Sequence, residues 1–136
     1  MSYLRITGSE GAGKTTSAIL TIAHFVREHL NEIRGNEQAA QPKVLLVSRS
    51  DHQARVLRRY FLERAESFGY CEGEAHGTVI VHTLAATAQR MEVPDNVRGY
   101  DFVLIDGLAR MAAATWVGLN RGSMRPGCCI VETEGS

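Results

Sequence analysis

A glycine-rich stretch near the start of the sequence carries its clearest chemistry. The stretch reads Gly8-Ser9-Glu10-Gly11-Ala12-Gly13-Lys14-Thr15 and fits the pattern G-x-x-x-x-G-K-[ST] without a mismatch. Glycines allow successive backbone N–H groups to point at phosphate oxygens, and a helix that begins here adds about half a positive charge. The Lys14 ammonium suits the β- and γ-phosphates, and the Thr15 hydroxyl suits Mg²⁺. We therefore predict that these eight residues and Thr16 bind ATP with Mg²⁺.

An aspartate at the end of an apolar run supplies a second part of such a site. Asp106 follows Phe102-Val103-Leu104-Ile105, where a buried strand is expected to end. A strand-end Asp of this kind holds the magnesium of a triphosphate, so Asp106 is predicted to share the metal with Thr15.

The next position weakens the prediction of rapid hydrolysis. Many ATPases that use such a loop place a glutamate after the strand-end Asp, where it activates water, but this chain has Gly107. Loss of a general base typically costs about 10²–10⁴ in rate. We expect Glu132, at the end of the last apolar run, to be the carboxylate that substitutes; the alternative is an ordinary solvated glutamate.

These residues are positioned by strands and helices that alternate along the chain. Apolar or β-branched runs predict strands over residues 3–7, 43–48, 78–82, 101–105 and 128–132. Helices are predicted over residues 14–34, from Asp51 to just before Gly69, and over residues 84–91 and 110–119. Asp51 is expected to cap the second helix.

This alternation predicts an α/β fold built of right-handed βαβ units. We expect a three-layer sandwich, with a mainly parallel five-stranded sheet and helices on both faces, forming a single domain over residues 1–136. In such sheets ligands bind beyond the carboxyl ends of the strands. The phosphate loop and Asp106 both follow predicted strands, so both are expected at that edge.

Composition excludes several classes of protein. The chain has 136 residues, with 15 Lys and Arg balanced by 15 Asp and Glu, which argues against a strongly basic nucleic-acid-binding surface. No apolar run approaches the roughly 20 residues that cross a bilayer, so no membrane partner is expected. The three cysteines lack the spacing of a zinc site, which favours a reduced, cytoplasmic protein.

The order of these segments resembles the first RecA-like domain of superfamily 1 DNA helicases of the UvrD/Rep type. Residues 6–16 resemble helicase motif I, residues 44–54 motif Ia, residues 79–84 the next block, and residues 100–106 motif II. Residues 128–132 occupy the place of the strand that leads to motif III. The resemblance implies a P-loop NTPase of RecA-like fold, with single-stranded DNA along Ser48, Arg49, Ser50 and Thr83.

The sequence also departs from that family. Motif II of the family reads Asp-Glu-x-Gln, whereas this chain has Asp106-Gly107-Leu108-Ala109, and the residues after Glu132 lack the motif III pattern. The second RecA-like domain of the family is missing from this sequence. Because unwinding needs two domains that open and close around ATP, we expect no helicase motor from this chain alone.

A basic stretch follows the second predicted strand. Its members are Arg49, His52, Arg55, Arg58 and Arg59. Such a stretch suits a phosphate backbone, and the alternative is a solvated helix face.

Three functions remain open from the sequence. The first is Mg²⁺-dependent ATP binding with slow or partner-stimulated hydrolysis, in which Lys14, Asp106 and Glu132 are the catalytic residues. The second is a non-catalytic nucleotide-binding switch or adaptor, and the third is a small P-loop kinase. Expected partners are a nucleoside triphosphate, single-stranded DNA, and a second protein or protomer that completes the site.

Overall fold

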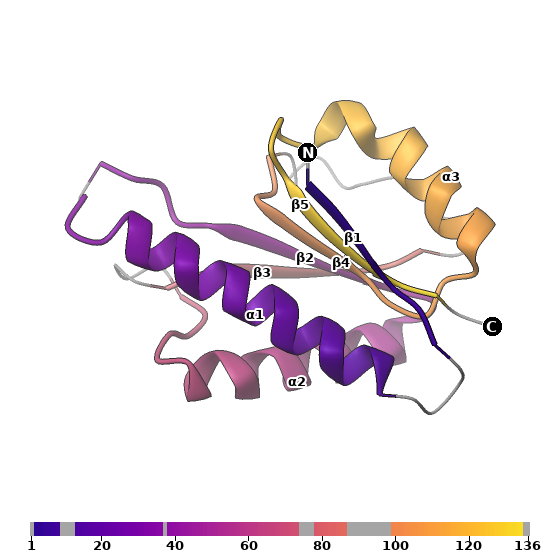
Figure 1. The fold of residues 1–136 in the computed structure, drawn as a ribbon, viewed down its shortest axis with the longest axis horizontal. Coiled ribbons are helices and arrows are strands. Elements are labelled where there is room, and N and C mark those ends of the chain that lie inside the picture. The colour runs from indigo at the N-terminus through magenta and orange to yellow at the C-terminus, as the bar shows by residue number, and fades with distance from the viewer. Residues whose placement is uncertain (1, 9–12, 37, 74–77, 87–98, 135–136) are drawn as a thin grey trace.

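The strands form one parallel sheet. The computed structural model describes residues 2–8, 13–36, 38–73, 78–86 and 99–134. The strands within them are β1 (Ser2–Ile6), β2 (Lys43–Ser48), β3 (Ile80–Ala85), β4 (Phe102–Ile105) and β5 (Cys129–Thr133). They lie in the order β1-β5-β4-β2-β3, and every neighbouring pair is parallel (Figure 1). The predicted five-stranded parallel sheet is confirmed.

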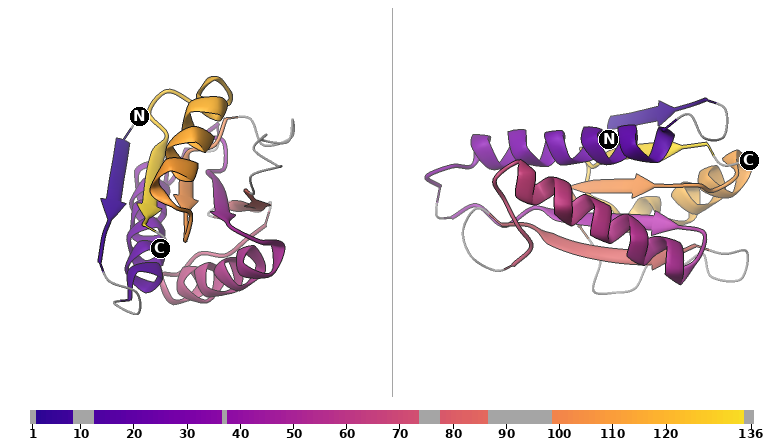
Figure 2. Two further views of the ribbon diagram at one scale, coloured as in Figure 1. Left: turned by 90° about the vertical axis from the view of Figure 1, so that its right-hand side faces the viewer. Right: turned by 90° about the horizontal axis from the view of Figure 1, so that it is seen from below.

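Helices cover both faces of this sheet. On one face lie α1 (Lys14–Glu32) and α2 (Asp51–Ser67), and on the other lies α3 (Arg110–Asn120), followed by the 3₁₀ helix η2 (Arg121–Ser123). Figure 2 shows the sheet between these two helical layers. The predicted three-layer arrangement is therefore confirmed.

Alternating side chains of the strands make two apolar cores. In β2, Val44 and Leu46 pack with α1 and α2, whereas Leu45 and Val47 pack on the side of α3. All four are fully buried, because a parallel strand covered on both faces has no solvent side. The continuous apolar runs in the sequence have this physical cause.

The start of α2 is held by a side-chain cap. Ser50 has extended backbone angles, and its hydroxyl accepts a hydrogen bond from the Gln53 amide at 3.1 Å. The prediction of Asp51 as the cap was wrong, since Asp51 is the first helical residue. Its charge there still interacts favourably with the positive end of the helix.

Two predicted elements need correction around the third strand. The strand expected over residues 78–82 is β3, which begins and ends later, at Ile80 and Ala85. A helix expected over residues 84–91 is wrong at its start, because Leu84 and Ala85 pair with β2. Residues 87–91 of that prediction lie outside the described residues. The β-branched and aliphatic run continues further than the local pattern indicated.

The structure shows no disulfide bond and no candidate membrane span among the residues that it describes. No helix there is both long and apolar enough to cross a bilayer. The three cysteines are free thiols; Cys71 is exposed, Cys129 is partly buried and Cys128 is buried. Noncovalent packing therefore joins the described elements.

Replacement of Ser50 by alanine tests the role of this cap. We expect Ser50→Ala to lower the free energy of unfolding by about 1 kcal/mol, because the Gln53 amide loses its acceptor. Urea denaturation followed by circular dichroism measures the change. Ser50→Asp is the control and should retain most of the stability; an unchanged midpoint in Ser50→Ala would contradict the assignment of the cap.

Candidate nucleotide-binding site

The order of the strands brings three chain segments together at one edge of the sheet. β1, β5 and β4 are neighbours, and their carboxyl ends lie at Ile6, Thr133 and Ile105. The chain leaves β1, passes through the predicted phosphate loop and enters α1 at Lys14. Asp106 follows β4 directly. Residues far apart in sequence thus meet at the edge where ligands bind in parallel sheets.

The first turn of α1 is set up by a glycine. Gly13 is the N-cap residue of α1 and has φ +80°, in the left-handed region where side chains are strained. Its carbonyl accepts the Ser17 amide at 3.0 Å, which begins the helical hydrogen bonding. The free N–H groups of this first turn form the positive end of a 19-residue helix.

Thr15 and Asp106 are in direct contact, which places them close enough to share a metal ion. The Thr15 hydroxyl donates to Asp106 Oδ1 at 2.9 Å, although 91 positions separate the two residues. Both side chains are half-buried at the edge of the sheet. Hydroxyl and carboxylate oxygens are the ligand types that Mg²⁺ prefers, so this pair could hold that ion together with phosphate oxygens and water.

Lys14 lies beside the same pair but points at the backbone. Its ammonium donates to the carbonyl oxygen of Glu134, just beyond β5, at 2.6 Å. The cation is therefore at the carboxyl edge of the sheet, within one residue of Thr15. This position suits an anion that approaches the N-terminus of α1.

Thr133 belongs to the site, although the sequence analysis missed it. Its hydroxyl donates to Asp106 Oδ1 at 2.7 Å and accepts the Gly107 amide at 3.0 Å. Thr133 thus donates to the same carboxylate oxygen of Asp106 as Thr15 does. A threonine one residue after Glu132, at the end of the last strand, was the available signal.

Other members of the predicted loop are placed less fully. Gly8 and Thr16 are exposed on either side of the site, after β1 and in the first turn of α1. The remaining predicted loop residues, Ser9, Glu10, Gly11 and Ala12, lie outside the described residues. Their role in binding phosphate stays a prediction.

Gly107 has a conformational reason to be glycine. Its φ is +74°, which costs a residue with a side chain about 1–2 kcal/mol. The backbone turns here so that the Gly107 amide reaches Thr133. A glutamate at this position would be strained in the observed backbone, which accounts physically for the absence of the usual base.

Glu132 occupies a different place from the one that the sequence suggested. β5 continues to Thr133, so Glu132 lies within the strand and projects from the face opposite the Thr133 hydroxyl. It is fully buried, 3.9 Å from the Arg5 guanidinium, and neither carboxylate oxygen has a hydrogen-bond partner among the described residues. Burial, and then the charge of Glu134, raises the pKa of Glu132. Glu132 is therefore not the last residue of the strand, where a catalytic carboxylate was expected, and the alternative of a solvated glutamate was wrong because the side chain is buried.

The predicted nucleic-acid residues are divided between structural and free roles. Ser48 is buried at the end of β2, and Ser50 caps α2. Arg49 is exposed between them. Thr83 was expected just beyond a strand, but it lies inside β3, two residues before its end.

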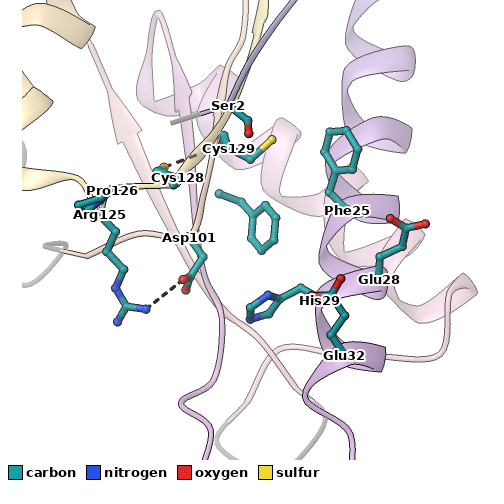
Figure 3. A pocket seen from close by; sticks show the side chains of 12 residues that line it. Ser2, Phe25, Glu28, His29, Glu32, Asp101, Arg125, Pro126, Cys128 and Cys129 are labelled. Carbon is teal, nitrogen blue, oxygen red and sulfur yellow. Dashed lines mark hydrogen bonds and ion pairs between the residues drawn. The ribbon is translucent and has the colours of Figure 1, made fainter.

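A cavity of about 340 Å³ lies at the opposite end of the sheet, where the strands begin. Figure 3 shows its lining, in which Phe25, His29 and Glu32 of α1 face Asp101 and Cys129. Asp101 pairs with Arg125 at 3.0 Å, and the His29 ring stands edge-on to Phe102. The cavity surrounds the amino ends of β1, β4 and β5, so it is separate from the site at the carboxyl ends.

Comparisons with known proteins add similarities of fold. No model of a known protein family matches the chain, and no curated protein matches it. Similar solved structures are the large terminase of bacteriophage HK97 (12% identity, TM-score 0.47) and the large terminase ATPase domain of Thermus phage P74-26 (14% identity, TM-score 0.47). They match 98% and 99% of this chain, which spans 29% and 60% of theirs. The function is therefore argued from the site of this chain itself.

Replacement of Glu132 by glutamine tests whether the buried carboxylate lowers the stability of the protein. Because the raised pKa means that burial disfavours the charged form, we expect Glu132→Gln to be at least as stable as the wild type at pH 7. The advantage should be absent below the unfolded pKa of about 4.5 and grow as pH rises through the folded pKa of Glu132. Thermal unfolding across this pH range measures the difference, and a variant that loses stability at pH 7 would contradict the interpretation.

Proposed function

We propose that this chain binds a magnesium complex of a nucleoside triphosphate, ATP in the first instance, in the turn between β1 and α1. The contact between Thr15 and Asp106 carries the proposal, because it unites the metal-binding ends of two sequence motifs across 91 positions. A glycine-rich turn that matched the pattern by chance has no reason to be met by an aspartate from a neighbouring strand end. Here both parts lie at one edge.

Each residue has a distinct role in this proposal. The Lys14 ammonium binds the β- and γ-phosphates, and the N–H groups at the start of α1 bind phosphate oxygens. The Thr15 hydroxyl and the Asp106 carboxylate orient the magnesium ion, which neutralises phosphate charge. Thr133 keeps the Asp106 carboxylate turned toward Thr15.

Hydrolysis is proposed to be slow unless a partner stimulates it. Gly107 carries no side chain, and Glu132 is buried on the far side of β5. A second protein or protomer that inserts a base or an arginine is the proposed source of stimulation. The same two observations favour the second candidate, a switch that binds nucleotide without turnover.

The two lysines of the chain provide a matched test of nucleotide binding. We expect Lys14→Ala to weaken Mg-ATP binding at least tenfold, because the variant has no ammonium to form a charge-assisted hydrogen bond with phosphate. Lys43 lies at the amino end of β2, away from the site, so Lys43→Ala should bind as the wild type does. Titration of a fluorescent ATP analogue, with and without Mg²⁺, measures the affinities.

The outcomes of this titration separate the alternatives. Equal affinities in Lys14→Ala and Lys43→Ala would refute the proposed site. Magnesium-dependent binding with no release of phosphate supports the non-catalytic switch, whereas slow release that depends on Lys14 supports an ATPase.

Single-stranded nucleic acid is the proposed partner at the same edge of the sheet. Arg49, His52 and Arg55 are exposed around the start of α2 and Arg59 is exposed in its middle, whereas Arg58 forms an ion pair with Glu72. The exposed cations follow β2, whose carboxyl end neighbours that of β4. They are therefore available to bind phosphates near the nucleotide site.

A double variant tests this partner. Arg49→Ala/Arg55→Ala should weaken the binding of a single-stranded oligonucleotide and make its affinity less sensitive to salt. The slope of log affinity against log salt concentration should fall by roughly 0.7 for each phosphate that the variant no longer neutralises. Arg34→Ala removes an exposed cation just beyond the far end of α1 and serves as the control. Fluorescence anisotropy at several salt concentrations measures both quantities. If the double variant and the control behave alike, the basic stretch is a solvated helix face.

A further inference from the structure

The two side chains of α1 proposed to take nucleotide and metal are already engaged with strand ends. Lys14 donates to the carbonyl oxygen of Glu134 at 2.6 Å, and Thr15 donates to Asp106 at 2.9 Å. Triphosphate and Mg²⁺ must therefore compete with acceptors of the protein itself. The competitor of Lys14 is the backbone just beyond β5, a segment with no other assigned role.

We call residues 133–134 the β5 tip. Thr133 is buried and pairs with Ile6 of β1, whereas Glu134, just beyond the strand, makes fewer contacts within the described part of the chain. Thr133 bonds to Asp106 and to the Gly107 amide, while the Glu134 amide donates to the Ile6 carbonyl at a long 3.3 Å. The Lys14 ammonium is the charged group that binds the Glu134 carbonyl. Without that ammonium, the outer residue of the tip keeps only its long bond to β1 among these hydrogen bonds.

We propose that nucleotide binding releases the β5 tip, because Lys14 exchanges the Glu134 carbonyl for phosphate oxygens. This inference rests on the proposed function of the site. A phosphate oxygen carries net charge and is a stronger acceptor for an ammonium than a neutral carbonyl. At the same time Thr15 exchanges Asp106 for the metal, which leaves the Thr133 hydroxyl as the remaining one of these two donors to Asp106.

Release of the tip would make the end of β5 the part of the structure that changes when nucleotide binds. In this proposal the tip is held against α1 while Lys14 binds the Glu134 carbonyl, and it can move once Lys14 binds phosphate. Coupling between two events is reciprocal. A change that detaches the tip should therefore strengthen nucleotide binding by the factor by which bound nucleotide favours the detached tip. The site would thereby be linked to whatever contacts the end of β5.

Hydrogen exchange provides the first test. In the wild type, Mg-ATP should slow exchange in the first turn of α1 and speed it at the β5 tip, the opposite of general tightening by a ligand. Lys14→Met without nucleotide should show the same fast exchange at the tip, since it lacks the ammonium. Lys43→Met is the control and should match the empty wild type.

A pair of substitutions at Glu134 provides the second test. Glu134→Pro removes the N–H that bonds to Ile6 and so loosens the tip, while the extended backbone of Thr133 accepts a following proline. Glu134→Ala lacks the same carboxylate but keeps the N–H, so comparison of the two isolates the backbone. We expect Glu134→Pro to bind Mg-ATP about threefold more tightly or better than Glu134→Ala. Thermal unfolding verifies that both variants are folded.

The two proposals fail in different ways. If the wild type binds no nucleotide, both are wrong. If Mg-ATP binds through Lys14 but the tip exchanges at the same rate or more slowly, only the release of the tip is overturned. Equal affinities in the two Glu134 variants, or equal exchange at the tip in empty wild type and Lys14→Met, likewise overturn it alone.

Discussion

The hydrogen bond from Thr15 to Asp106 is the contact on which the candidate site depends. It forms because β5 is the one strand between β1 and β4, so the ends of all three meet at one edge. Thr133, at the end of the middle strand, binds both Asp106 and the Gly107 amide and so joins the ends of β5 and β4. Without this order of strands, a glycine-rich turn and an acidic strand end would be two unrelated features.

Much of this arrangement could be predicted from the sequence because its signals are local. Continuous apolar runs identified strands buried on both faces, and the phosphate-loop pattern identified the start of α1. The roles of Glu132 and Thr133 were missed because the last strand was expected to end one residue early. Because β5 continues to Thr133, Glu132 is an interior residue of the strand, and its carboxylate is buried rather than solvated. No periodicity in a short apolar run settles where the run ends.

The same site shows why binding and turnover are separable here. In the proposed function, Lys14 supplies charge and Thr15 and Asp106 supply metal ligands for a bound triphosphate. The left-handed backbone at Gly107 and the burial of Glu132 leave water activation to another group. The proposed response to nucleotide is therefore a change in contacts, in which Lys14 leaves the Glu134 carbonyl.

A crystal structure with Mn²⁺ and a non-hydrolysable ATP analogue, using the anomalous signal of the metal, would show whether Thr15 and Asp106 share a metal ion. We expect one metal ion at the carboxyl ends of the strands, bound by the Thr15 hydroxyl. Asp106 should contact this ion directly or through water. The triphosphate should lie at the N-terminus of α1 with Lys14 on its outer phosphates. A metal bound elsewhere, or a Thr15–Asp106 pair untouched by the nucleotide, would contradict the proposed site.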